Sequence, residues 1–113
     1  MFTLQQKQIA NFTKIEEAKF VQKTVVFIKY NYRDWAKNRS DEELDDFVNE
    51  MILIGKNSKI FKEVNIQKLI FLNIQFQYPL PLTFAHRILL KEENIDEDHR
   101  VKKFYKALLN KSS

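Results

Sequence analysis

Glycine is almost missing from this sequence, and its scarcity limits the folds open to the chain. One glycine and two prolines occur among 113 residues, whereas ordinary usage is about 7% and 5%. Tight turns between strands need residues that accept a left-handed backbone, above all glycine. The scarcity of glycine therefore favours helices over strands. The hydrophobic content, 44% of the residues, is enough for one core, and the length suits one domain. We therefore predict an all-α fold, a compact single-domain bundle of about five helices over residues 1–113.

Apolar residues recur at helical spacing in successive segments of the chain. The predicted helices span approximately residues 3–37, 40–56, 62–77, 82–91 and 96–110. One arc of the first helix is apolar and includes Tyr32 and Trp35, so its aromatic side chains are expected to pack in the core. The residues of this arc are Phe20, Val21, Val25, Phe27, Ile28, Tyr32 and Trp35. The apolar residues of the short fourth helix are Phe84, Ala85, Ile88 and Leu89.

A run of acids opens the second predicted helix, in the sequence RSDEELDDF. Ser40 with Glu43 three residues later has the form of a capping box, and acids in a first turn interact favourably with the helix dipole. The remaining acids, which exceed what a helix start needs, are Asp41, Glu42, Asp45 and Asp46. A divalent metal site would need several oxygens to converge on one point, and no histidine lies nearby. We therefore expect a helix start whose surplus charge is available to a basic partner.

Basic residues lie on the arc of the first helix opposite its apolar residues. They are Lys23, Lys29, Arg33 and Lys37. With a net charge of +4 and an isoelectric point near 9.3, they define an alternative nucleic-acid-binding face. The basic first helix can instead pair with the acidic second helix inside one bundle. The sequence leaves open which of these arrangements holds.

The segment QYPLPL places Leu80 between two prolines. A residue before proline is pushed out of the helical region, so this segment ends the third predicted helix. Leu80 is then either a core or hinge residue or an exposed apolar anchor for a partner.

Residues that carry catalysis or bind metals are scarce. Cysteine is absent, and His86 and His99, the two histidines, lack the spacing of metal ligands. One glycine cannot form a phosphate-cradling loop. We therefore predict no enzyme activity, no cofactor and no metal. No signal peptide and no apolar stretch of membrane-spanning length is visible, so we expect a cytoplasmic protein that does not bind membranes.

Several short features follow one another through nearly the whole chain. They are Gln8 with Phe12 and Phe20, SDEELDDFV with Gly55, Ile60 with Glu63 and Ile66, Ile88-Leu89, and Asp98 with Arg100. In this order the sequence resembles small all-helical accessory proteins that bacterial type VI secretion clusters encode beside spike, PAAR and effector genes. The resemblance implies no catalytic residues. It implies a protein-binding accessory, either an immunity protein or an adaptor for an effector or spike component.

We therefore predict a non-enzymatic protein-binding accessory of a type VI secretion or toxin system, whose partner is a toxin, effector or spike component. The partner-binding residues would combine electrostatic steering with an apolar anchor. They are Asp41, Glu42, Asp45, Asp46 and Leu80. The alternative is a small basic nucleic-acid-binding regulator that uses the four basic residues of the first helix.

Overall fold

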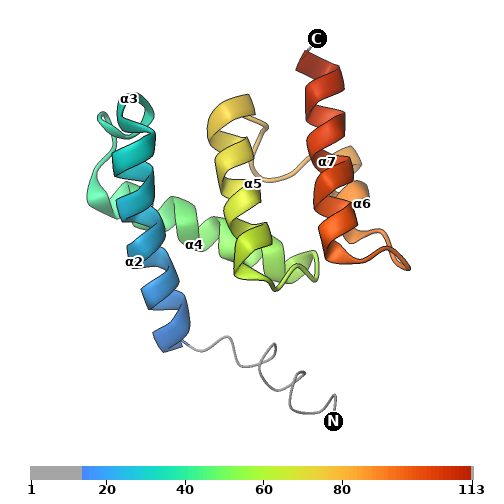
Figure 1. Ribbon diagram of the computed structural model, residues 1–113, viewed down its shortest axis with the longest axis horizontal. Coiled ribbons are helices and arrows are strands. Elements are labelled where there is room, and N and C mark those ends of the chain that lie inside the picture. Colours follow the sequence, from blue (N-terminus) through green and yellow to red (C-terminus); the bar gives the residue numbers. More distant parts are fainter. Residues whose placement is uncertain (1–13, 113) are drawn as a thin grey trace. The chain divides into compact units, whose positions relative to one another are not determined.

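The computed structural model describes residues 14–112 of the chain, and Figure 1 shows the elements in sequence colours. The helices are α2 (Lys14–Asn31), α3 (Arg33–Ala36), α4 (Asp41–Asn57), α5 (Glu63–Phe76), α6 (Phe84–Lys91) and α7 (Glu97–Ser112). No strand occurs within residues 14–112, so the predicted all-α fold is confirmed for this range. The predicted helix start at residue 3 lies outside the described residues.

The predicted C-terminal end of the first helix, residue 37, is wrong. α2 ends at Asn31, and Tyr32 leaves the helical backbone region (φ −128°, ψ 52°) before the four-residue α3 begins. Asn31 gives a local reason, because its side-chain Nδ2 donates to the carbonyl oxygen of Phe27 at 3.0 Å. Such local bonds compete with continuation of a helix. The other helices begin and end within two residues of their predicted bounds.

The chain divides into two compact units, Met1–Asn49 and Glu50–Ser113, and the boundary falls inside α4. In the described part of the first unit, the buried residues of α2 and α4 recur every three or four positions. They are Phe20, Val21, Thr24, Val25, Ile28, Leu44 and Val48. Trp35 of α3 packs against Phe47 of α4, with ring centroids 5.1 Å apart. Phe27, expected on the buried arc, is 46% exposed, because it lies at the edge of that arc.

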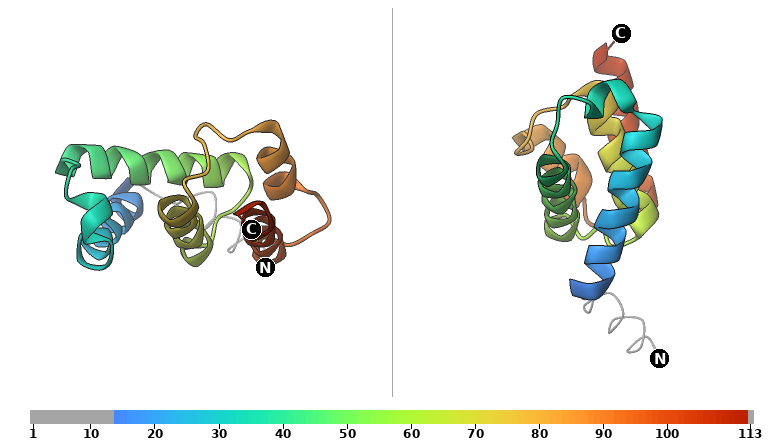
Figure 2. Two further views of the ribbon diagram at one scale, coloured as in Figure 1. Left: turned by 90° about the horizontal axis from the view of Figure 1, so that it is seen from above. Right: turned by 90° about the vertical axis from the view of Figure 1, so that its left-hand side faces the viewer.

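In the second unit, α5 and α7 run side by side in the same direction, and α6 lies against α7 (Figures 1 and 2). The fully buried side chains of these helices include Ile66, Leu69, Ile70, Leu90 and Phe104. Burial of one such side chain contributes about 1.5–3 kcal/mol. The close approach between α4 and α5 also explains the glycine: a Cβ at Gly55 would lie 3.2 Å from Cγ1 of Ile66 and 3.1 Å from the carbonyl oxygen of Ile60.

A buried arginine joins four parts of the second unit. Arg100 is 8% exposed, and within residues 14–112 the recorded acceptors of its guanidinium are backbone carbonyl groups. Nε donates to Ile95 at 2.9 Å, Nη1 to Ser58 at 2.6 Å and also to Leu90, and Nη2 to Lys59 at 3.1 Å. These carbonyls lie just after α4, in the last turn of α6 and just before α7. Helix C-termini carry partial negative charge, so Arg100 binds the ends of two helices at once.

The start of α7 in turn caps the start of α5. Lys62, the N-cap residue of α5, makes no side-chain cap bond. The carboxylate of Glu97 accepts instead from the backbone nitrogens of Lys62, at 3.0 Å, and of Phe61, at 3.3 Å. The fully buried Asn65 donates Nδ2 to Glu97 at 2.9 Å and to Asp98 at 2.7 Å. These carboxylates also offset the positive ends of two helix dipoles that point the same way.

Replacement of Arg100 by methionine should lower the free energy of unfolding by about 3 kcal/mol or more, because buried carbonyl groups lose a charged donor. Urea unfolding followed by circular dichroism measures the change. Arg33→Met is the matched control, since Arg33 is exposed and its loss should change stability by less than about 0.5 kcal/mol. Equal losses in the two variants would contradict the role given to Arg100.

Candidate functional site

The acidic run forms the helix start that its sequence predicts. Ser40 Oγ accepts from the backbone nitrogen of Glu43 at 3.0 Å, and Glu43 Oε1 accepts from the backbone nitrogen of Ser40 at 2.8 Å. The predicted capping box is therefore confirmed. Asp41 forms an ion pair with Lys29 of α2, so part of the opposite charge of these two helices is paired within the first unit. Such exposed pairs contribute about 0–1 kcal/mol.

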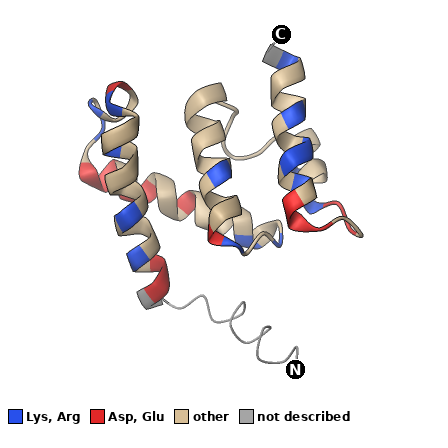
Figure 3. Cartoon of the chain, in the orientation of Figure 1, with Lys and Arg blue, Asp and Glu red and all other residues tan. Residues whose placement is uncertain are grey.

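The surplus acids remain on the surface. Figure 3 shows the acidic residues gathered at the start of α4. Glu42, Asp45 and Asp46 are exposed, so they are accessible to a basic partner, and that role stays a prediction. Among the described residues, no group of three or more His, Cys, Asp or Glu side chains is arranged to hold a metal ion.

The apolar surface near the proline segment lies on α6 more than at Leu80. Leu80 is half-buried, whereas Phe84 is 70% exposed and Ile88, one helical turn later, is 52% exposed. Arg87 and Lys91 are exposed beside them and are also one turn apart. We call these four residues the outer face of α6. With Glu92 they line a shallow depression of about 410 Å³.

Local contacts set the position of α6 on the chain. The side chain of Thr83 caps the helix by accepting from the backbone nitrogen of His86 at 3.2 Å. Arg87 donates Nη1 to the carbonyl oxygen of Leu82 at 3.2 Å, and Arg100 binds the carbonyl of Leu90. Both ends of the helix are therefore held, and its rotation about its own axis is held with them.

The opposite side of α6 is buried and carries a histidine. His86 is 8% exposed, and Leu90, one turn later, is fully buried. The imidazole ring packs edge-on against Tyr78 and Phe104, with ring centroids 5.9 Å and 4.9 Å away. Its Nδ1 has no hydrogen-bond partner among the described residues. Burial, with a smaller effect from Lys111, lowers the pKa of His86 below its ordinary value of 6.5.

Three residues of α6 depart from the usual pattern of apolar residues inside and polar residues outside: His86 is buried, and Phe84 and Ile88 are exposed. An unpaired polar nitrogen faces the core, where its burial costs about 1–3 kcal/mol, while a phenylalanine and an isoleucine face outward. Helical spacing predicted that Phe84 and Ile88 share a face, and this is confirmed. The spacing did not indicate whether this face is buried or exposed. Leu82, His86 and Leu90 are also spaced four residues apart, and this second row, which is buried, was the signal that could have indicated it.

The predicted basic face lies on α2, α3 and the turn that follows. Lys23, Lys29, Arg33 and Lys37 are all exposed. Tyr30 is 67% exposed, and the guanidinium carbon of Arg33 lies 6.0 Å from its ring centroid. The expectation that the aromatic side chains of this segment pack against the protein holds for Trp35, which is half-buried against Phe47. It is wrong for Phe27 and Tyr30, which are exposed.

No protein-family model matches the chain, and neither the characterised proteins nor the solved structures include a significant match. No helix within residues 14–112 has the length and apolar character needed to cross a membrane.

Proposed function

We propose that this protein is a non-enzymatic accessory that binds another protein through the outer face of α6. The observation that carries the proposal is that Phe84 and Ile88 of this helix are exposed while His86 is buried. A sequence selected for stability alone would place the apolar residues inward, and local rules are broken mainly at functional sites. Exposed aromatic and aliphatic residues beside arginine also have the composition of binding hot spots.

The charges around Phe84 indicate what the partner surface must offer. Arg87 and Lys91 lie on the same face, and both are positive. A matching partner has an apolar pocket for Phe84 and carboxylates at the rim of that pocket, because rim charges steer association and fix orientation. The sequence resemblance to type VI secretion accessory proteins suggests a toxin, effector or spike component, for which this chain would act as immunity protein or adaptor. The acids Glu42, Asp45 and Asp46 offer a second, basic-partner surface in the first unit.

Co-expression with the products of the genes next to its own tests the proposal. The wild-type chain should co-purify with one of these products, whereas Phe84→Glu/Ile88→Glu should lose the complex, because two buried anchors become desolvated charges. Leu53→Glu is the control, since Leu53 is also exposed, at 57%, and lies on α4. Helical content is compared first by circular dichroism.

No complex with any neighbouring product would overturn the proposal. So would equal loss of binding in the Leu53→Glu control, because the effect would then not belong to the outer face of α6.

A second candidate function is nucleic-acid binding through the basic face of α2 and α3. The exposure of Tyr30 and Phe27 next to Lys23 and Arg33 favours it, because exposed aromatic rings between basic side chains can stack on bases while the cations bind phosphate. The pairing of Lys29 with Asp41 counts against it, since that pair reduces the positive charge.

Gel-shift titration with a single-stranded oligonucleotide tests this candidate. Binding should weaken steeply as salt increases, and Tyr30→Ala should weaken it by about tenfold, the loss of one stacking contact. Absence of any shift at low salt would exclude this candidate.

A further inference from the structure

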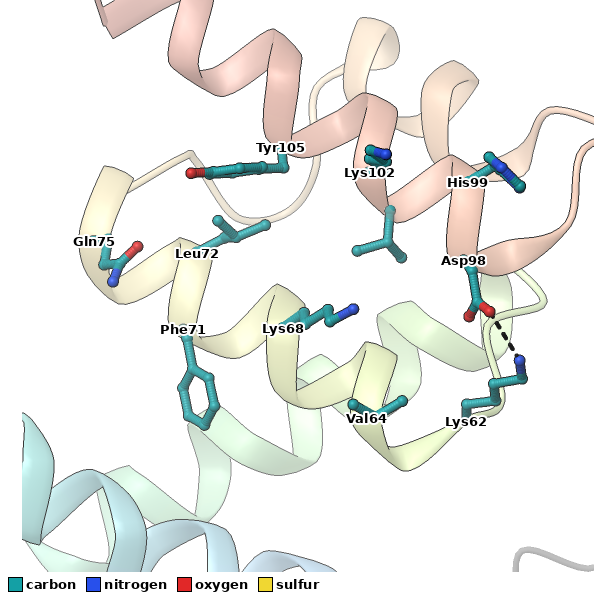
Figure 4. Close-up of a pocket in the computed structure, with 11 residues that line it drawn as sticks. Lys62, Val64, Lys68, Phe71, Leu72, Gln75, Asp98, His99, Lys102 and Tyr105 are labelled. Carbon is teal, nitrogen blue, oxygen red and sulfur yellow. Dashed lines mark hydrogen bonds and ion pairs between the residues drawn. The ribbon is translucent and has the colours of Figure 1, made fainter.

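The second unit has another concave surface, which shares no residue with the outer face of α6. It is an open groove of about 700 Å³ between α5 and α7. Figure 4 shows side chains from both helices converging on it. Leu72 and Val101 are its buried apolar residues, and Val64 and Tyr105, 51% and 42% exposed, extend the apolar surface outward.

Lysines stand on both sides of this groove. Lys68 comes from α5 and Lys102 from α7, and both are exposed. No ion pair joins either lysine to a carboxylate of the described residues, although the charge of Lys68 contributes to lowering the pKa of Asp98. A third lysine, Lys62, is paired with Asp98 at 3.1 Å at one end of the groove (Figure 4). Three lysines against one aspartate leave two positive charges on the lining, apart from His99, which is bound to Asp96.

The length of the groove indicates the shape of its ligand. From Val64 to Gln75 the α5 wall comprises twelve residues, whose eleven steps of 1.5 Å give a length of about 16 Å, or three helical turns. Val64, Lys68 and Leu72 are one helical turn apart on α5, so Lys68 lies between apolar residues of this wall. On the α7 wall, Lys102 follows Val101. This arrangement complements an amphipathic helix that carries acids beside its apolar stripe, where they meet Lys68 from one wall and Lys102 from the other. Such binding is the helix-in-groove mode of recognition.

We propose that the groove between α5 and α7 binds an acidic amphipathic helix of a partner protein. Lys68 on the α5 wall and Lys102 on the α7 wall bind the acidic side chains of this helix. The apolar residues of the groove pack against its row of leucines or similar side chains. The proposal does not depend on the outer face of α6, because the two surfaces have no residue in common. A second copy of this chain, presenting the acidic start of α4, is the competing occupant.

The test uses a synthetic helical peptide of about 15 residues, the length at which isolated helices begin to form. Leucines occupy one stripe at helical spacing, and glutamates flank it. A control peptide has lysines in place of the glutamates. Fluorescence anisotropy with the full chain should show binding of the glutamate peptide at least about tenfold tighter than that of the lysine peptide.

Charge reversal then assigns the site. Lys68→Glu/Lys102→Glu should weaken binding of the glutamate peptide by about tenfold or more, with two charge pairs reversed. Lys19→Glu/Lys106→Glu makes the same change of net charge at exposed lysines outside the groove, and it should change the affinity by less than about twofold. Phe84→Glu/Ile88→Glu should bind the peptide as the wild type does, so failure of this proposal and failure of the α6 proposal are distinguishable.

The proposal is overturned by equal affinity for the two peptides, by equal effects of the two lysine double variants, or by no binding up to about 1 mM. Sedimentation of the wild type at the same concentrations tests the competing occupant. If the chain self-associates and Lys68→Glu/Lys102→Glu abolishes that association, the groove binds a second copy and the proposal is wrong.

Discussion

The guanidinium of Arg100 is the interaction on which the second unit depends. It is a buried charge, and its compensation comes from backbone carbonyls of Ser58, Lys59, Leu90 and Ile95. A cation is favourable at the C-terminal end of a helix, and two such ends, those of α4 and α6, meet it here. The loop into α7 is held by the same group. Loss of this one side chain would therefore release three connections of the chain at once.

The anchoring of α6 by Arg100 has a functional consequence. A helix of eight residues is too short to be stable alone, so its orientation depends on its contacts. The bond from Arg100 to Leu90, the bond from Arg87 to Leu82 and the Thr83 cap hold it with Leu90 and His86 inward. Phe84 and Ile88 are then directed outward. The same end of α7 that supplies Arg100 also supplies Glu97 and Asp98, which tie α7 to α5. Asp98, paired with Lys62, lies at one end of the groove between these two helices.

Spacing of apolar residues was sufficient to predict the helical segments, because each helix buries one face and the period of that face is visible in the sequence. Ser40 and Glu43 were also predictable, since a capping box is a local interaction. Arg100 was not, because its acceptors are backbone carbonyls up to 42 residues away and no side-chain pattern marks them. The scarcity of glycine correctly favoured helices, yet Lys59, Gln77 and Asn94 adopt positive φ angles of 56°, 54° and 70°. Non-glycine residues accept this cost, about 1 kcal/mol, where other contacts compensate, as Arg100 does at the carbonyl of Lys59.

The fold does not require a phenylalanine at position 84, which faces outward, or a histidine at position 86, which faces inward. Exchange of the two residues, Phe84→His/His86→Phe, tests it directly and leaves the composition unchanged. The free energy of unfolding, measured in urea, should equal or exceed that of the wild type by about 1 kcal/mol, because an apolar ring replaces a buried polar one. A loss of more than about 2 kcal/mol, beyond what a slightly larger ring costs in a packed core, would contradict the account.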